Sequence, residues 1–219
     1  MRALTITIGI TLLAAVPSFA QSERAYINGV GGFTVTSDIT ARDVSAEGGV
    51  RIAPRLFVFG NVGQFHNLRP SDIQPTVDFA TAVSADEGLG VTGTGRVPAT
   101  YSTGGLRLQV PTHSRVLPYV LGGVGAARLK PTARFTFASG SFPDGTAPAV
   151  GDDVTTQVES VFDVTVPMPT TAFMLTLGGG VEVPVSHHWA VDADYRYARV
   201  STETPLNAQG ATFGFGYRF

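Results

Sequence analysis

Nine charged residues recur at alternating positions of short, otherwise apolar segments, where their side chains could act together. They are Glu47, Arg51, Arg107, Arg128, Glu182, Asp192, Asp194, Arg196 and Arg218. Such a cluster of carboxylates and guanidinium groups could move protons in catalysis, line a path for ions, or form a structural salt-bridge network. We favour the network, because an unpaired buried ion costs several kcal/mol and a planar guanidinium satisfies two carboxylate oxygens at once.

Hydrolytic and metal chemistry have weaker support. The histidines are His66, His113, His187 and His188. A serine nucleophile needs a histidine base within hydrogen-bond reach, and the side chains of adjacent residues in a strand, such as His113 and Ser114, point apart. We therefore predict no catalytic residue, no cofactor and no metal site. A lipid-modifying enzyme remains a lesser alternative.

The segments that carry the nine charges, together with two further segments, have the period of two that is typical of strands. Eight such segments cover residues 24–34, 43–53, 55–67, 100–110, 116–130, 169–184, 188–200 and 209–219. In the last one, Phe213, Phe215, Tyr217 and Phe219 share one face, and glycines with Arg218 share the other. Tilted strands of about ten residues cross a bilayer. The pattern predicts an all-β fold, an eight-stranded antiparallel transmembrane β-barrel.

The connections between these segments alternate in length. The turns near residues 54, 111–114 and 184–187 are short, and the connections 35–42, 68–99, 131–168 and 201–208 are longer. Short periplasmic turns and long extracellular loops are typical of bacterial outer-membrane barrels. Because Arg51, Arg107, Glu182, Asp192 and Arg218 all lie near a short turn or the C-terminus, we expect them to share a layer in the periplasmic half of the lumen. The lipid-facing register of segments 24–34 and 55–67 is ambiguous.

The N-terminus has the features of a secretory signal. Arg2 precedes an apolar run from Leu4 to Val16, and Ser18 and Ala20 place small residues before a cleavage point. We predict a signal peptide over residues 1–20, cleaved after Ala20, and an outer-membrane β-barrel domain over residues 21–219. The chain has no cysteine, which excludes disulfides and a lipoprotein anchor. Its net charge of −2 gives no reason to expect nucleic-acid binding.

Four short motifs carry a family resemblance. They are Tyr26–Gly32, Pro118–Gly125, Asp192–Tyr197 and Phe215–Phe219. With them the chain resembles the small outer-membrane barrels of the opacity-protein and OmpA-transmembrane-domain type. The resemblance implies a closed barrel in the bacterial outer membrane, in contact with lipid and lipopolysaccharide, and a role in adhesion, immune evasion or envelope integrity. It also implies that Tyr217 and Phe219 belong to the signal recognised by the barrel-insertion machinery.

The two long loops, 68–99 and 131–168, are the expected place for a surface partner. Both carry more acidic than basic residues, which argues against capture of polyanions unless divalent cations bridge them. Residues 133–137 and 163–166 are β-prone, and we expect them to prolong their neighbouring strands as a protruding hairpin with free edges. The sequence thus favours a non-enzymatic surface barrel acting in envelope integrity or in adhesion through its loops. A narrow channel for small solutes is the alternative, and the charges in the lumen argue against it.

Overall fold

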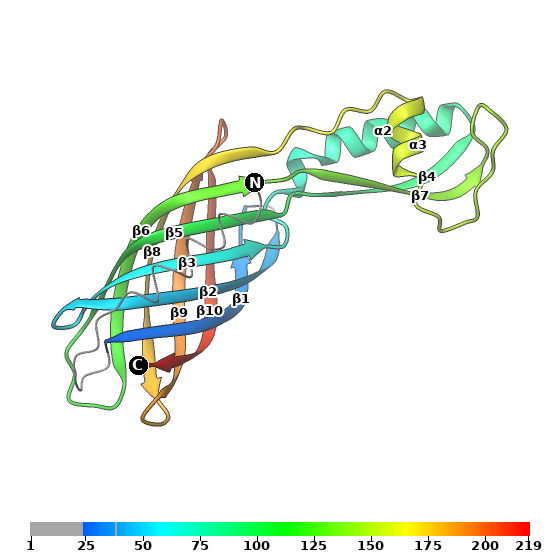
Figure 1. The fold of residues 1–219 in the computed structure, drawn as a ribbon. Helices are drawn as coiled ribbons and strands as arrows, with labels where there is room; N and C mark the ends of the chain where they lie inside the picture. The colour runs from blue at the N-terminus through cyan, green and yellow to red at the C-terminus, as the bar shows by residue number, and fades with distance from the viewer. Residues whose placement is uncertain (1–23, 38) are drawn as a thin grey trace, which may run out of the picture.

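The computed structural model describes residues 24–37 and 39–219 and contains one closed barrel with a long projection (Figure 1). The predicted signal peptide, residues 1–20, lies outside the described residues. The barrel strands are β1 (Ala25–Val35), β2 (Thr40–Ala53), β3 (Leu56–Phe65), β5 (Ala99–Gln109), β6 (Leu117–Leu129), β8 (Thr170–Pro184), β9 (Trp189–Ser201) and β10 (Leu206–Arg218). They close in the order β1-β10-β9-β8-β6-β5-β3-β2, and all neighbouring pairs are antiparallel. The predicted eight-stranded antiparallel barrel is confirmed.

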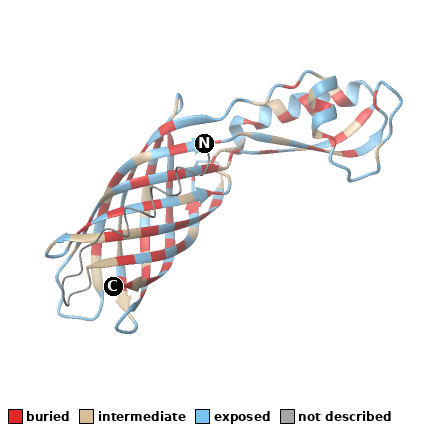
Figure 2. Ribbon diagram, viewed as in Figure 1, coloured by how far each residue is buried: buried red, intermediate tan, exposed pale blue. Residues whose placement is uncertain are grey.

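Buried and more exposed residues alternate along most of each barrel strand (Figure 2). The outward face carries the large exposed apolar side chains, which is the arrangement that a lipid-facing surface requires. The structure resolves the register of β3, because Phe57 and Phe59 are buried inside the barrel and Val58 and Val62 are exposed outside. No helix in the described part of the chain is long and apolar enough to cross a bilayer.

The projection grows directly out of two neighbouring barrel strands. Strand β4 (Leu89–Arg96) leads into β5, and β6 leads into β7 (Thr132–Gly140). The pairing register does not change across the junction, since Ala99 faces Leu129 in the barrel and Arg96 faces Thr132 beyond it. The two strand pairs therefore form one long ribbon, interrupted only around Pro98 and Pro131. We call residues 67–98 and 130–169, which project beyond the barrel, the arm.

Two helices complete the arm. The helix α2 (Gln74–Asp86) follows the 3-10 turn η1 (Pro70–Asp72) and packs on β4, and α3 (Thr155–Val161) lies against β7. Ile73, Val77 and Phe135 are almost fully buried between them. Glycine is required on β4, because a Cβ on Gly93 would lie 2.4 Å from a methyl group of Val77. The arm has a hydrophobic core of its own, continuous with buried residues at the mouth of the barrel.

The predicted hairpin is only partly correct. Residues 133–137 do prolong the barrel ribbon within β7, but their partner is β4 and not residues 163–166, which form no strand. The loop 68–99 also contains α2, which the sequence pattern did not indicate. The buried face of α2 consists of Val77, Ala80 and Ser84, and such small side chains give a weak apolar period.

Candidate functional site

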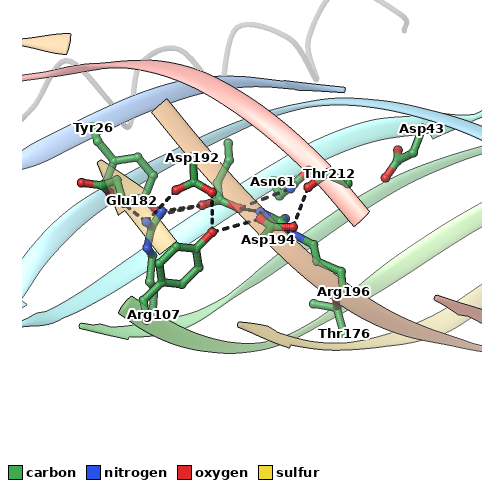
Figure 3. Close-up of polar contacts among 12 residues, drawn as sticks. Tyr26, Asp43, Asn61, Arg107, Thr176, Glu182, Asp192, Asp194, Arg196 and Thr212 are labelled. Atoms are coloured by element: carbon green, nitrogen blue, oxygen red, sulfur yellow. Dashed lines mark hydrogen bonds and ion pairs between the residues drawn. The ribbon is translucent and has the colours of Figure 1, made fainter. Parts of the chain in front are cut away.

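The lumen of the barrel contains a connected network of charges centred on Arg107 (Figure 3). One terminal nitrogen of Arg107 lies 2.8 Å from Glu182 Oε2 and 2.9 Å from Asp192 Oδ2. The other lies 3.4 Å from Glu47 Oε1. The side chains of Arg107 and Glu47 are at most 1% exposed. One arginine thus joins carboxylates from three different strands across the lumen.

The network continues on both sides of this centre. Toward the end with the short turns, which is the predicted periplasmic end, Arg218 pairs with Glu182. Toward the extracellular end, one terminal nitrogen of Arg196 lies 2.8 Å from Glu47 Oε2 and 2.7 Å from Asp194 Oδ2. Acidic and basic groups therefore alternate along the lumen, so that each charge is close to an opposite one.

Two tyrosines belong to the same network, and the sequence analysis did not single them out as site residues. Tyr119 donates a hydrogen bond of 2.5 Å to Asp192 and lies 3.0 Å from Asp194 Oδ2, and Tyr26 donates one of 2.8 Å to Glu47. Their rings flank the guanidinium of Arg107, at 3.6 Å for Tyr119 and 4.9 Å for Tyr26. Both tyrosines could have been identified from the alternation, which places them on the inward face near the periplasmic ends of β6 and β1.

Two of the nine predicted residues lie outside this network, Arg51 on the inward face of β2 and Arg128 on the outer face of β6. Arg51 is half-buried, with its guanidinium 5.3 Å from the centre of the Phe57 ring. The prediction that Arg128 lies in the lumen is wrong, because Arg128 is exposed on the outer face of β6 while its neighbours Ala127 and Leu129 are buried. Near the extracellular mouth the inward positions hold an apolar cluster that includes Ala127 and Leu129, so the charged residue between them faces outward.

The extracellular half of the lumen is different in character. The Tyr101 hydroxyl lies 3.1 Å from Asp43 Oδ1, and the Tyr101 ring stacks on Phe65 at 4.7 Å. Between this layer and Arg196 lies a cavity of about 20 Å³, which has room for about one water molecule. Above it, Leu129, Val200 and Leu206 are buried in the cluster that joins the barrel to the arm.

The predicted insertion signal lies in a group of aromatic residues at the periplasmic end. The Tyr217 and Phe219 rings are 5.0 Å apart, and Trp189 stacks on Phe215 at 4.7 Å. His188 stacks on Tyr217 with ring centres 5.4 Å apart. Aromatic side chains of this kind lie at the interface between lipid and water.

No group of three or more metal-ligating side chains gathers among the described residues. In the arm, Asp153 is an ion-pair partner of Arg134, at 2.9 Å, and accepts a hydrogen bond of 2.6 Å from the Thr155 hydroxyl. Asp152 accepts a bond of 3.0 Å from the backbone of Ala149. These acids therefore stabilise the local loop structure.

Comparison with known proteins agrees with this architecture. The family described as outer membrane protein beta-barrel domain matches residues 6–219. No curated protein matches the sequence. Among solved structures, Neisserial surface protein A (NspA) is 15% identical, with a TM-score of 0.53, over 89% of this chain and 96% of that one. A major outer membrane protein from Thermus thermophilus is 10% identical, with a TM-score of 0.51, over 89% of this chain and 99% of that one. At these identities the structural likeness shows the fold.

Proposed function

The chain belongs to the outer membrane protein beta-barrel domain family, and from this premise we propose that it is a closed, non-enzymatic barrel that presents its arm to a protein partner outside the cell. In this proposal the barrel lies in the bacterial outer membrane, with the short turns in the periplasm and the arm at the cell surface, as is typical of such barrels. The proposal assigns different tasks to the two parts. The lumen stabilises the barrel, and the arm makes the contacts.

The contents of the lumen support the first assignment. The alternating ion pairs occupy its periplasmic half, and an apolar cluster closes its extracellular mouth. Paired and hydrogen-bonded buried charges are typical of a structural network, because each would be costly alone. We infer that the barrel carries no solute, and that the network acts as a plug.

The packing of the arm is the observation that carries the second assignment. Ordering a residue costs about 1–2 kcal/mol of backbone entropy, and a barrel closes equally well with short loops. Here two long connections instead share a core in which Ile73, Phe135 and Val158 are completely buried. Long ordered loops on a rigid scaffold are usually the functional part of a protein.

The outer edge of β4 offers a specific means of binding. The Lys130 N–H donates to the Pro98 carbonyl, so these residues form a hydrogen-bonded pair of the antiparallel ladder. Such pairs alternate with pairs whose backbone groups point away from the partner strand. Counting along the constant register, Gly93 and Gly95 direct their N–H and C=O groups to the outer edge of β4. Among the described residues no strand pairs with that edge.

The opposite edge of the ribbon is already covered. The Phe137 N–H donates to Asp152, and the Phe135 carbonyl accepts from Val154. The edge of β4 is therefore the open one, and an extended segment of a partner protein could add there as a further strand.

The test compares cells that display the full chain with cells that display an armless chain. In the armless chain, residues 70–95 and 133–166 are each replaced by a short glycine-serine turn. The junctions are close in space, since the Leu68 N–H donates to the Val97 carbonyl and Leu129 faces Thr170. We expect cells with the full chain to adhere to at least one of immobilised fibronectin, laminin and mucin, and the armless cells to lose this adhesion.

Folding of the armless barrel is checked by its heat-modifiable mobility in gels. Equal adhesion by both kinds of cell, or adhesion by neither, contradicts the proposal. If the armless cells adhere equally but admit large antibiotics, the arm serves envelope integrity instead. Conductance by the full chain in planar bilayers contradicts the closed lumen.

A further inference from the structure

The outer face of the ribbon carries one basic residue in each of four successive rows. The rows pair Arg128 with Thr100, Lys130 with Pro98, Arg96 with Thr132, and Arg134 with Thr94. All four basic residues are exposed. Residues on one face of a strand repeat about every 6.8 Å, so the row of charges is about 20 Å long. We call these four residues the basic row.

Most of the charge in the basic row is uncompensated. Arg134 pairs with Asp153 at 2.9 Å, with both side chains well exposed. Within the described part of the chain, Arg96, Arg128 and Lys130 have no carboxylate at ion-pair distance. Three neighbouring positive charges on one face make an anion-binding surface in spite of the acidic net charge of the loops.

Apart from Asp153, which pairs with Arg134 on this face, the structure keeps the acids of the first long loop away from it. Asp78, Asp86 and Glu87 are exposed on α2 or at its end, and α2 packs on the opposite face of the ribbon, through Val77. The total charge of the two long loops is acidic, which by itself predicts repulsion of polyanions. That total does not describe the outer face of the ribbon.

A groove runs along the same face. It has a volume of about 820 Å³ and is lined by Arg96, Arg134, Asp153 and threonines of β4, β7 and α3. Threonine hydroxyls donate hydrogen bonds and suit a ligand whose oxygens accept them. Arginine beside hydroxyl donors is well suited to phosphate.

The position of the basic row identifies the source of the phosphate. On β6 the outward residues Val120, Val124 and Ala126 belong to the lipid-facing surface, and Arg128 is the next outward residue. The basic row therefore begins where the apolar surface ends, at the level of the lipid headgroups. On the neighbouring strands, Arg42 and His66 are exposed and lie beside each other, since the His66 N–H donates to the Arg42 carbonyl. His66 follows Phe65, which pairs with Ala99 at the base of the ribbon.

We propose that the basic row binds the phosphate groups of glycolipid headgroups in the outer leaflet, and that this contact ties the base of the arm to the membrane surface. Both the charge and the continuity with the lipid-facing surface support this ligand. The proposal goes beyond partner binding at the edge of β4 and does not depend on it.

The experiment measures the affinity of the full chain, in nonionic detergent, for diphosphorylated lipid A by native mass spectrometry. Each basic residue near an anionic surface strengthens binding about fivefold. The double variant R96Q/K130Q should therefore bind lipid A about thirtyfold more weakly than the unaltered chain. The control R55Q/R115Q removes two exposed charges near the periplasmic turns and should bind like the unaltered chain. Dephosphorylated lipid A should bind weakly to all of them.

Both pairs of substitutions replace exposed side chains, so the fold is retained, and gel mobility verifies this. Equal lipid A affinity of R96Q/K130Q and the unaltered chain overturns the proposal. The proposal is also overturned if the unaltered chain binds phosphorylated and dephosphorylated lipid A with equal affinity. A heparin fragment that binds through Arg96 and Lys130, with no binding of lipid A, would instead assign the basic row to a soluble polyanion and also overturn it.

Discussion

Arg107 and Tyr119 are joined twice, once directly and once through Asp192. The guanidinium of Arg107 lies 3.6 Å from the centre of the Tyr119 ring, and the hydroxyl of that ring donates to Asp192, which Arg107 also binds at 2.9 Å. Each of the three groups thus fixes the positions of the other two. This closed set of contacts allows several buried charges to lie together in a narrow lumen.

Replacing Arg107 by methionine should strongly destabilise the barrel. The substitution leaves Glu47, Glu182 and Asp192 without their shared counter-charge. Breaking a buried ion pair from one side costs about 3–5 kcal/mol. Urea titration of the barrel in lipid vesicles, followed by gel mobility, measures the loss. Arg115→Met, at an exposed turn position, is the matched control and should change little. Similar midpoints for the two variants would show that Arg107 is not the centre of the network.

Tyr119→Phe separates the two contacts of this tyrosine. The ring stays over Arg107, but the hydrogen bonds to Asp192 and Asp194 are lost. Asp194 Oδ2 keeps its bonds from Arg196, but Asp192 Oδ1 loses its donor, and leaving a buried acceptor without a donor costs about 1–3 kcal/mol. We expect a loss of this size in the same titration, and a larger one for Tyr119→Leu, which also removes the ring. If both variants unfold like the unaltered chain, neither contact contributes to stability.

The barrel could be predicted from the sequence because its pattern is local. Alternation along a strand needs only neighbouring residues, and each strand boundary agrees to within three residues, with the largest differences at Thr40 and Leu206. The arm depends instead on a distant pairing. Strand β4 contains three glycines, a residue that is depleted in strands, and its partner β7 follows only after two further barrel strands.

Among the residues predicted for the lumen, those near the periplasmic end were predicted correctly and Arg128, near the extracellular end, was not. Alternation places Glu47, Arg107 and Glu182 on the inward face, and the structure brings them together. It placed Arg128 incorrectly, because the extracellular end of the lumen is filled by apolar side chains such as Leu129. A sequence pattern does not show at which height along a barrel the filling changes from ionic to apolar.

Gly93→Ala should loosen the arm and leave the barrel intact. The new Cβ would lie 2.4 Å from Val77 Cγ1 and 3.1 Å from the Phe135 ring, so α2 must move away from β4. Overpacking of this kind costs about 1–3 kcal/mol. Limited proteolysis should cut the arm of the variant faster, with unchanged gel mobility of the barrel. The control is Gly60→Ala, where a Cβ meets nothing within 4 Å. Equal cleavage of the arm in both variants would mean that α2 does not depend on close contact with β4.

Acid should loosen the start of α3. Hydrogen bonds from the Thr155 hydroxyl and backbone N–H, together with Arg134, hold the pKa of Asp153 below its usual value. The Thr155 hydroxyl in turn accepts a bond from the Phe135 N–H, so this carboxylate helps to dock α3 on β7. A pKa lowered by folding contributes stability above the unfolded value of about 3.9, and this contribution is lost as pH falls through the folded pKa.

Protection factors from hydrogen exchange of residues 154–158 measure this effect. In the unaltered chain they should fall as the pH is lowered below the ordinary aspartate pKa of about 3.9 and through the lowered pKa of Asp153. In Thr155→Val, which lacks the hydroxyl donor, they should start lower and change less with pH. Asp144 also has a lowered pKa, through hydrogen bonds from Thr146, but it has no bond to α3, so Asp144→Asn should keep the full pH dependence. A pH profile that is the same in Thr155→Val and in the unaltered chain would show that another group controls the docking of α3.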